Sequence, residues 1–191
     1  IQQVGFFSYA DEDNVPFADG VFFTPSGKVE LSSPIFAESG LSGVPDGNTA
    51  IPQEGIPEGH HRQDGLHLLS PAAHHFINSS MANQDTLLRK EQPASVMLNP
   101  RDALQRHLKS GDRARLFNAR GEFFRAVVIT DRTLPGVAVA ANGYWQDGEK
   151  LQTVNRTTPD QLADVAGQST FHSNLIWIEG VDAGSREEAV I

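Results

Sequence analysis

The sequence predicts a mainly β fold with a few short helices. Two observations predict this class. Short apolar segments of strand length recur between residues 66 and 179, each followed by residues that favour turns, and only one segment carries a clear helix start. Many short strands with few helices are typical of a barrel or a sandwich rather than of a doubly wound sheet. Strand counting alone does not separate the barrel from the sandwich.

The first predicted strand is the short apolar run from Leu66 to Leu69, and Val96 to Leu98 has the composition of a second, buried strand. A helix is expected from Pro100 to about Leu108, because Asn99 can cap the free N–H groups and proline suits the first helical turn. The polar stretch over residues 72–88 is interpreted as a loop or a short helix.

A hairpin is predicted next. Between residues 112 and 117 apolar and arginine side chains alternate, which is the period of a half-buried strand. Residues 118–121 then form a tight turn, and residues 122–130 return as a strongly apolar strand. Two further strands are expected over residues 137–141 and 175–179.

Composition divides the chain into two regions. Residues 1–63 hold 2 basic and 9 acidic side chains and 14 of the 28 glycines and prolines, whereas residues 64–191 hold 13 basic and 15 acidic side chains. Only the second region has the composition of a compact domain. We expect this domain over residues 65–181, a flexible linker over 39–64 and a disordered tail over 182–191.

Two further features concern the ends of this organisation. The turn sequence Thr24-Pro25-Ser26-Gly27 lies between two apolar clusters and predicts a small hairpin over about residues 21–31. The chain also begins with Ile1 rather than methionine, so we expect it to be a piece of a longer protein.

Charge and cysteine content exclude several classes of function. The formal net charge of -9 argues against a nonspecific binder of nucleic acid or of an anionic membrane, and no apolar run is long enough to span a bilayer. Because the chain has no cysteine, it can form no disulfide, thiolate metal site or cysteine nucleophile. This absence does not identify a cellular compartment.

The segment after the first predicted strand is the strongest candidate for a binding site. It is rich in side chains that donate or accept hydrogen bonds, and ligands are often held at strand ends. Neutral donors and free backbone N–H groups can hold a phosphate without a large positive charge. The candidates are Ser70, His74, His75, Asn78, Ser79 and Ser80. A polar surface loop with a helix cap is the alternative interpretation.

Two later segments are also candidates. Asn142 and Gly143 precede the aromatic pair Tyr144-Trp145, which could line a ring-binding pocket or pack against the end of the barrel. A polar run that contains Asn155 and Asp164 follows, and it lies before Gly167-Gln168. An aspartate can accept paired hydrogen bonds from guanine, but the aspartates of this run also suit the first turns of a helix starting near residue 158.

Two catalytic interpretations are weak. A zinc site would need three or four converging ligands, and adjacent histidines such as His60-His61 and His74-His75 point in different directions. His60 and His61 are expected to be solvated linker residues. Ser79, His75 and Asp164 could compose a hydrolytic triad on paper, but no serine lies in a G-x-S-x-G pattern.

The order of five segments carries a resemblance that covers residues 21–179. These segments are Phe23 to Leu31 with its TPSGK sequence, Leu66 to Ser80, Val96 to Ala103, Ser110 to Gly121 and Leu134 to Val139. The polar run from residue 155 to 171 fits the same series. In this order they resemble the C-terminal part of molybdopterin oxidoreductases of the dimethyl sulfoxide reductase type.

The resemblance implies the following fold and cofactor. Residues 1–38 would be the tail of a preceding domain, and the compact domain would be a double-psi β-barrel of the aspartate-decarboxylase-like class. It would hold bis(molybdopterin guanine dinucleotide), with molybdenum or tungsten ligated by a residue of an earlier domain. The six candidates of the first segment would contact pterin or phosphate groups, and Asn142 and Gly143 would lie at the cofactor face. Asn155, Asp164 and Gln168 would help to hold the second ligand or a guanine. This chain has Ser70-Pro71-Ala72 where many members have Thr-x-Arg, and His172 where many have lysine.

The resemblance also implies a division of labour. The chain would bind and close over the cofactor, while redox chemistry, with an iron–sulfur cluster, would need the complete subunit. Its partners would be the remaining domains of the same polypeptide and electron-transfer subunits, with no nucleic acid and no membrane contact. The alternatives are a stand-alone double-psi barrel that serves as an interaction or substrate-recognition module, and an unrelated small β-barrel enzyme.

Overall fold

The computed structural model describes residues 15–44, 55–91, 93–145, 152–163 and 167–181. The chain divides into two compact units, Ile1–Thr49 and Ala50–Ile191. The second unit contains every β-strand of the described residues. The finer domain boundaries expected from the sequence, at residues 38, 64 and 181, stay predictions.

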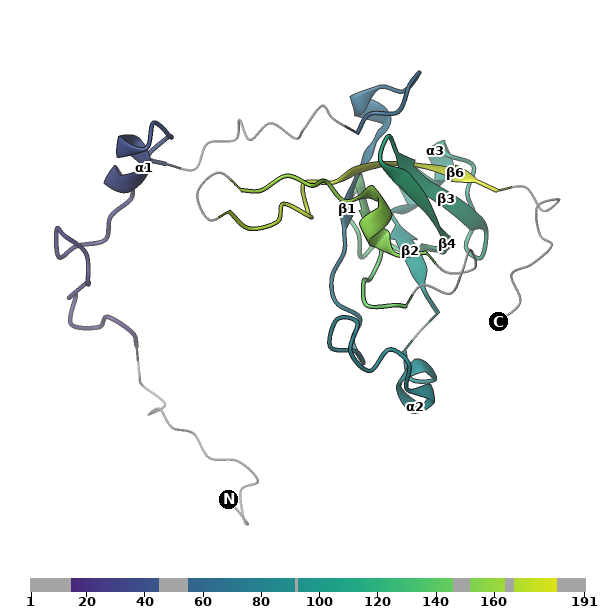
Figure 1. The fold of residues 1–191 in the computed structure, drawn as a ribbon, viewed down its shortest axis with the longest axis horizontal. Coiled ribbons are helices and arrows are strands. Elements are labelled where there is room, and N and C mark those ends of the chain that lie inside the picture. The colour runs from purple at the N-terminus through teal and green to yellow at the C-terminus, as the bar shows by residue number, and fades with distance from the viewer. Residues whose placement is uncertain (1–14, 45–54, 92, 146–151, 164–166, 182–191) are drawn as a thin grey trace, which may run out of the picture. The chain divides into compact units, whose positions relative to one another are not determined.

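The second unit is a closed six-stranded barrel (Figure 1). Its strands are β1 (Leu66–Leu69), β2 (Ser95–Leu98), β3 (Arg113–Asn118), β4 (Gly121–Ile129), β5 (Val137–Val139) and β6 (Leu175–Gly180). Around the barrel the order is β1, β5, β2, β4, β3, β6, and β6 closes onto β1. The predicted mainly β, double-psi barrel class is confirmed, and the sandwich is excluded.

Two of the six strand pairings are parallel, β1 with β5 and β2 with β4. The four others are antiparallel, and among them only β3 and β4 form a hairpin of consecutive strands. A parallel pair requires a crossover rather than a tight turn. The chain therefore crosses the barrel between β1 and β5, which brings together segments that lie far apart in the sequence.

The helices are short, and only part of the expected one forms. They are α1 (Pro34–Glu38), α2 (Asp85–Leu88) and α3 (Pro100–Gln105), with 3-10 helices η1 (Arg62–Asp64) and η2 (Val154–Thr157). Asn99 caps α3 as predicted, by accepting a hydrogen bond from the N–H of Arg101. The helix ends at Gln105 rather than near Leu108, because His107 adopts a positive φ of 55° and Leu108 turns into the core.

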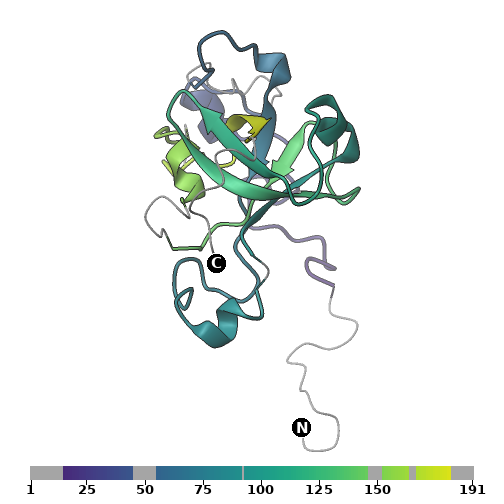
Figure 2. The same ribbon diagram turned by 90° about the vertical axis from the view of Figure 1, so that its right-hand side faces the viewer.

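The barrel core is formed by the inward-facing side chains of all six strands, and its largest buried member is Phe123. Helix α2 and the loop before it project from one end of the barrel in both views (Figures 1 and 2). None of the described helices combines the length and the apolar composition that a membrane crossing requires.

A buried polar network fixes η2 against the barrel. The side-chain amide of Asn118 donates to the carbonyl oxygens of Thr157 and Leu175, at 2.8 and 3.1 Å. Asn174 donates to the hydroxyl of Thr157 at 3.1 Å. Gly121 allows the close approach, since a Cβ at this position would lie 2.8 Å from the carbonyl oxygen of Arg156. The end of η2 is therefore held in a defined position at the hairpin.

Two expectations for residues 21–64 differ from the structure. Residues 21–31 form turns and bends rather than a hairpin, since a two-stranded hairpin without a sheet or core beside it is marginal. Residues 55–64 of the expected linker contact the barrel: Gly55 accepts a hydrogen bond from the N–H of Ala119, and the ring of His60 lies edge-on to Phe117 and Trp177. His60 thus covers aromatic surface, although the residue itself is exposed.

Candidate functional site

The parallel pairing of β1 with β5 brings two of the predicted binding segments together. Because the carboxyl ends of parallel strands meet at the same edge, the chain after Leu69 and the chain after Val139 leave the barrel side by side. The N–H of Asn142 donates to the carbonyl of Pro71 at 2.9 Å, and its side-chain amide donates to the carbonyl of Ser70 at 2.8 Å. Asn142 therefore joins the two loops.

The loop over residues 74–80 is held from behind by Glu91. The carboxylate of Glu91 accepts hydrogen bonds from the backbone N–H of His75 at 2.7 Å and from its ring Nδ1 at 3.0 Å. Burial opposes ionisation of Glu91, but these hydrogen bonds outweigh it and lower the pKa of the carboxyl below its usual value of 4.5. His75 thus serves to position the loop.

Gly143 lets the second loop approach the first. Its φ of 97° disfavours any other residue, and a Cβ would lie 2.4 Å from the carbonyl oxygen of Asn78. The neighbouring aromatic residues strengthen the contact: Tyr144 lies edge-on to Phe76, and the indole N–H of Trp145 donates to the carbonyl of Ser79. The two loops therefore form one wall.

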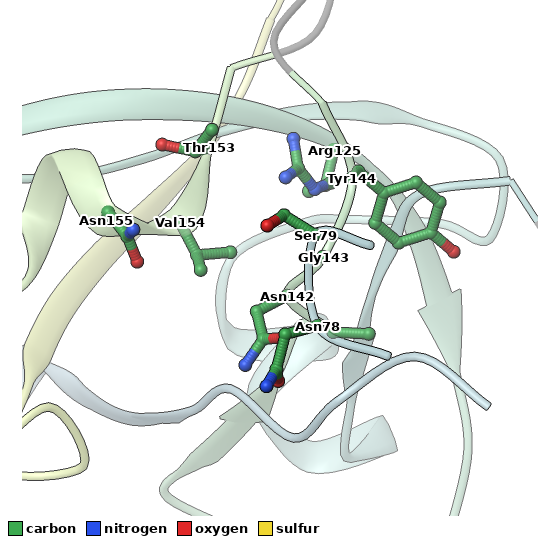
Figure 3. A pocket seen from close by; sticks show the side chains of 10 residues that line it. Asn78, Ser79, Arg125, Asn142, Gly143, Tyr144, Thr153, Val154 and Asn155 are labelled. Atoms are coloured by element: carbon green, nitrogen blue, oxygen red, sulfur yellow. The ribbon is translucent and has the colours of Figure 1, made fainter. Parts of the chain in front are cut away.

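The opposite wall is the start of η2, with Thr153, Val154 and Asn155. Between the walls lies a cavity of about 290 Å³, which is also lined by residues 78–79, residues 141–144 and Arg125 (Figure 3). In the view of Figure 3, the side chains of Asn142 and Asn78 lie on one side, and Thr153, Val154 and Asn155 on the other.

The structure brings together five of the eleven predicted residues, Asn78, Ser79, Asn142, Gly143 and Asn155. Ser70 is buried behind Asn142, and His75 is bound to Glu91. His74 and Ser80 are exposed but do not line the cavity, and Gln168 lines a separate hollow formed by residues 168–173. Asp164 lies outside the described residues. Contact of these residues with a cofactor stays a prediction.

Arg125 is the lining residue that the sequence did not single out. On β4 it occupies the inward-facing row between Phe123 and Val127, and it is 3% exposed. The strand alternation contains this signal, because an arginine stands where the pattern predicts an apolar side chain. Burial lowers the pKa of Arg125 to about 10, so it remains charged at neutral pH.

Tyr144 also titrates abnormally. Burial, together with the negative charge of Glu91, raises the pKa of its phenol, and the nearby positive charge of Arg125 acts in the opposite direction. The cavity therefore presents a neutral phenol, a guanidinium cation, and amide and hydroxyl groups. Its described lining contains no carboxylate. Such a lining suits an anionic ligand that carries hydrogen-bonding rings.

The other chemistries considered from the sequence find no site in the described ranges. No three histidine or carboxylate side chains come together there in a group that could hold a metal ion. His75, required for the hydrolytic triad, is held by Glu91.

Comparison with known proteins identifies a family and several relatives. Residues 66–175 match the family described as "Molydopterin dinucleotide binding domain". The chain is 32% identical to the probable oxidoreductase YoaE of Bacillus subtilis over 87% of its own length and 23% of that protein. It is 33% identical to trimethylamine-N-oxide reductase 1 of Escherichia coli, over 82% of this chain and 20% of the relative.

Two further comparisons agree. Dimethyl sulfoxide reductase DmsA of Escherichia coli is 29% identical over 83% of this chain and 21% of its own length. Among solved structures, acetylene hydratase from Pelobacter acetylenicus superimposes with a TM-score of 0.62 at 19% identity, over 85% of this chain and 24% of the other, a likeness of fold. The chain thus spans between a fifth and a quarter of the length of these relatives.

Proposed function

Because the chain belongs to the molybdopterin dinucleotide-binding domain family of dimethyl sulfoxide reductase-type enzymes, we propose that it is the cofactor-holding part of a larger molybdenum or tungsten oxidoreductase. Its cofactor is molybdopterin guanine dinucleotide. We place the cofactor's contact with this chain in the cavity between residues 78–79, 141–144 and 153–155. When bound, the cofactor supplies a metal centre for redox chemistry.

The convergence of three segments on one cavity carries this proposal. More than sixty positions separate residues 78–79 from residues 142–143, and twelve separate Gly143 from Asn155. All five of these predicted residues nevertheless line the same cavity. Each segment alone could be interpreted simply as a polar surface loop. Their meeting at the carboxyl ends of β1 and β5 is the arrangement in which ligands are commonly held.

The donor set fits the chemistry of a dinucleotide. Asn78, Asn142 and Asn155 offer amide groups that can pair with the edges of a pterin or guanine ring, and Ser79 and Thr153 offer hydroxyl groups. The phosphates need a positive or neutral lining, and the described lining has no carboxylate to repel them. A cavity of about 290 Å³ is at the small end of ligand sites, so it would hold part of the cofactor.

The rest of the cofactor would be covered by the remaining domains of the same polypeptide. The loops beside the cavity expose Ile77, Met81 and Trp145, each at least half accessible. Exposed apolar side chains at the rim of a ligand site suit a surface that another domain covers. We expect substrate turnover, and electron transfer to other subunits, only in the complete enzyme, and none by this chain alone.

The proposal is tested by titrating the 191-residue chain with molybdopterin guanine dinucleotide, and with GDP as its nucleotide half, while amide chemical shifts are recorded. Shifts are expected at residues 78–79, 142–144 and 153–155, and not at Gln168. Asn155→Ala should weaken binding, whereas Gln168→Ala, which removes a predicted residue outside the cavity, should not. If no amide around the cavity responds to either ligand, the alternative of an interaction module is favoured and the proposed site is wrong.

A further inference from the structure

Arg125 is a charged residue in an apolar row. Successive residues of a strand face opposite sides, so Phe123, Arg125 and Val127 share the inward face of β4. Phe123 is fully buried, Val127 is 1% exposed, and Arg125 itself is 3% exposed. Arginine is rarely buried to this degree without a partner of opposite charge.

The partners of Arg125 do not neutralise it. Its Nη1 donates to the carbonyl of Phe124 at 2.7 Å, and its Nη2 donates to the carbonyl of Gln152 at 2.8 Å. Its Nε is buried and has no hydrogen-bond partner in the part of the chain that the structure describes. No ion pair joins Arg125 to a carboxylate of the described residues.

Arg115 shows the contrast. It lies on β3, its side chain is 37% exposed, and it pairs with both Glu122 and Glu179. Arg115, which water can solvate, therefore has two counter-ions. Arg125, which is buried, has none among the described residues. A buried charge without a counter-ion destabilises the folded chain, so its position calls for a ligand or another compensating role.

The position of Arg125 indicates which ligand. Its side chain lines the cavity with Thr153 and Tyr144 (Figure 3), and the two carbonyl contacts fix the guanidinium plane. Where water is largely excluded, a fixed cation attracts an anion more strongly than it does on the surface. Guanidinium groups match phosphate oxygens in both charge and geometry.

We propose that Arg125 is the anion-binding residue of the cavity and holds a phosphate group of the bound nucleotide. This inference rests on the proposed function and deepens it, because it assigns the phosphate to β4 and leaves ring recognition to the asparagines. The predicted polar residues of the loops then determine which ring is bound. Arg125 determines that the preferred ligand carries a phosphate group.

The test compares GDP with guanosine, since the two differ only in the diphosphate. Dissociation constants are measured by calorimetry for the wild-type 191-residue chain, for Arg125→Met and for Arg113→Met. Arg113 is the matched control, because it also lies on a strand and does not line the cavity. Its guanidinium lies 4.8 Å from the centroid of the Phe124 ring, as that of Arg125 lies 5.0 Å from the centroid of the Phe123 ring. Wild type and Arg113→Met should bind GDP at least about tenfold more tightly than guanosine. In Arg125→Met this ratio should fall to near one, with guanosine affinity unchanged.

A second variant and a second probe keep the test decisive. If Arg125→Met does not fold by circular dichroism, Arg125→Gln, which retains an amide donor for the carbonyls, is measured instead with the same expectation. Inorganic pyrophosphate alone should shift the amides of residues 125 and 153 in wild type and not in the variant.

The outcomes separate this inference from the proposed function. If GDP binds and its advantage over guanosine survives in the Arg125 variants, Arg125 has a structural role and the inference is overturned, while the proposed site stands. If neither GDP nor guanosine shifts any amide around the cavity, the proposed site is wrong and the inference falls with it.

Discussion

Phe23 and Phe123 are the same side chain in two different regions of the molecule. Phe23, in the N-terminal unit, is 97% exposed, whereas Phe123, in the barrel, is fully buried. The difference extends to their neighbours. No residue of the described range 15–44 is buried, while all six strands of the barrel contribute buried residues to one core.

The comparison shows what stabilises each region. The N-terminal unit relies on local hydrogen bonds, such as that from the hydroxyl of Thr24 to the carbonyl of Lys28 at 2.7 Å and the cap of α1 by Ser33. Local bonds exposed to water contribute little to folding stability. The barrel relies on buried contacts between residues far apart in sequence. This difference supports the proposal that residues 1–38 are the tail of a preceding domain.

The largest effect is expected from the two phenylalanines themselves. Phe123→Ala should lower the free energy of unfolding by about 3–5 kcal/mol, because it removes a fully buried ring and leaves a cavity. Phe23→Ala should change it by less than about 0.5 kcal/mol. Urea unfolding followed by the fluorescence of the buried Trp177 measures both. Equal effects of the two substitutions would break the comparison.

A smaller effect is expected from buried and exposed hydrogen bonds. Asn118→Ala should cost about 2–3 kcal/mol, because it removes the buried hydrogen bonds from Asn118 to the backbone carbonyl of Thr157 and to the side-chain carbonyl of Asn174. Thr24→Ala, which removes an exposed hydrogen bond, should cost less than about 0.5 kcal/mol. The same unfolding assay applies. A cost at Asn118 no larger than that at Thr24 would show that the network does not hold η2.

A third pair concerns carboxylates and pH. The pKa of Glu91 is lower in the folded chain than its usual value of 4.5. Ionised Glu91 therefore stabilises the barrel fully above about pH 4.5, and this stabilisation is lost as the pH falls through the pKa of the folded state. Glu91→Gln should therefore cost about 1 kcal/mol at pH 7, and the gap to wild type should narrow in acid. Urea unfolding at pH 7 and pH 3 measures this gap.

Glu30→Gln is the control in the N-terminal unit, where the carboxylate accepts an exposed hydrogen bond from the N–H of Ser26. Its effect at pH 7 should stay below about 0.5 kcal/mol. A gap for Glu91→Gln that does not narrow between pH 7 and pH 3 would contradict the assigned role of Glu91.

The smallest effect is expected from removing the first unit. Deletion of residues 1–49 should change the unfolding free energy of the barrel by less than about 0.5 kcal/mol, because the described part of that unit buries no side chain. Calorimetric unfolding of the full and the shortened chain measures this. A loss of several kcal/mol would mean that the two units stabilise each other.

The sequence predicted the strands well because their signals are local. Alternation over residues 112–117, the turn at 118–121 and the apolar return strand correspond to the hairpin of β3 and β4. The small hairpin over 21–31 was wrong because turn residues alone do not supply the surface that a strand pair needs.

The site was predicted in part, for a similar reason. The polar segments after β1 and β5 are visible in the sequence, but their meeting depends on a parallel pairing that no local pattern encodes. Gln168 was predicted from its position in the family resemblance, and it lies in another hollow. Arg125 was overlooked because it belongs to a strand that was interpreted as part of the hydrophobic core. Only the closed barrel shows that the Arg125 side chain lines a cavity.

The parallel pairing of β1 with β5 also has a kinetic consequence. Leu68 pairs with Ala138, so the two loops that form one wall of the cavity meet only after a loop of about seventy residues has closed. Chains whose contacts are this distant in sequence fold slowly, since much entropy is lost before the contacts form. A nascent chain therefore does not form the cavity until its barrel has closed, and we expect a ligand to bind at the proposed site only after that step.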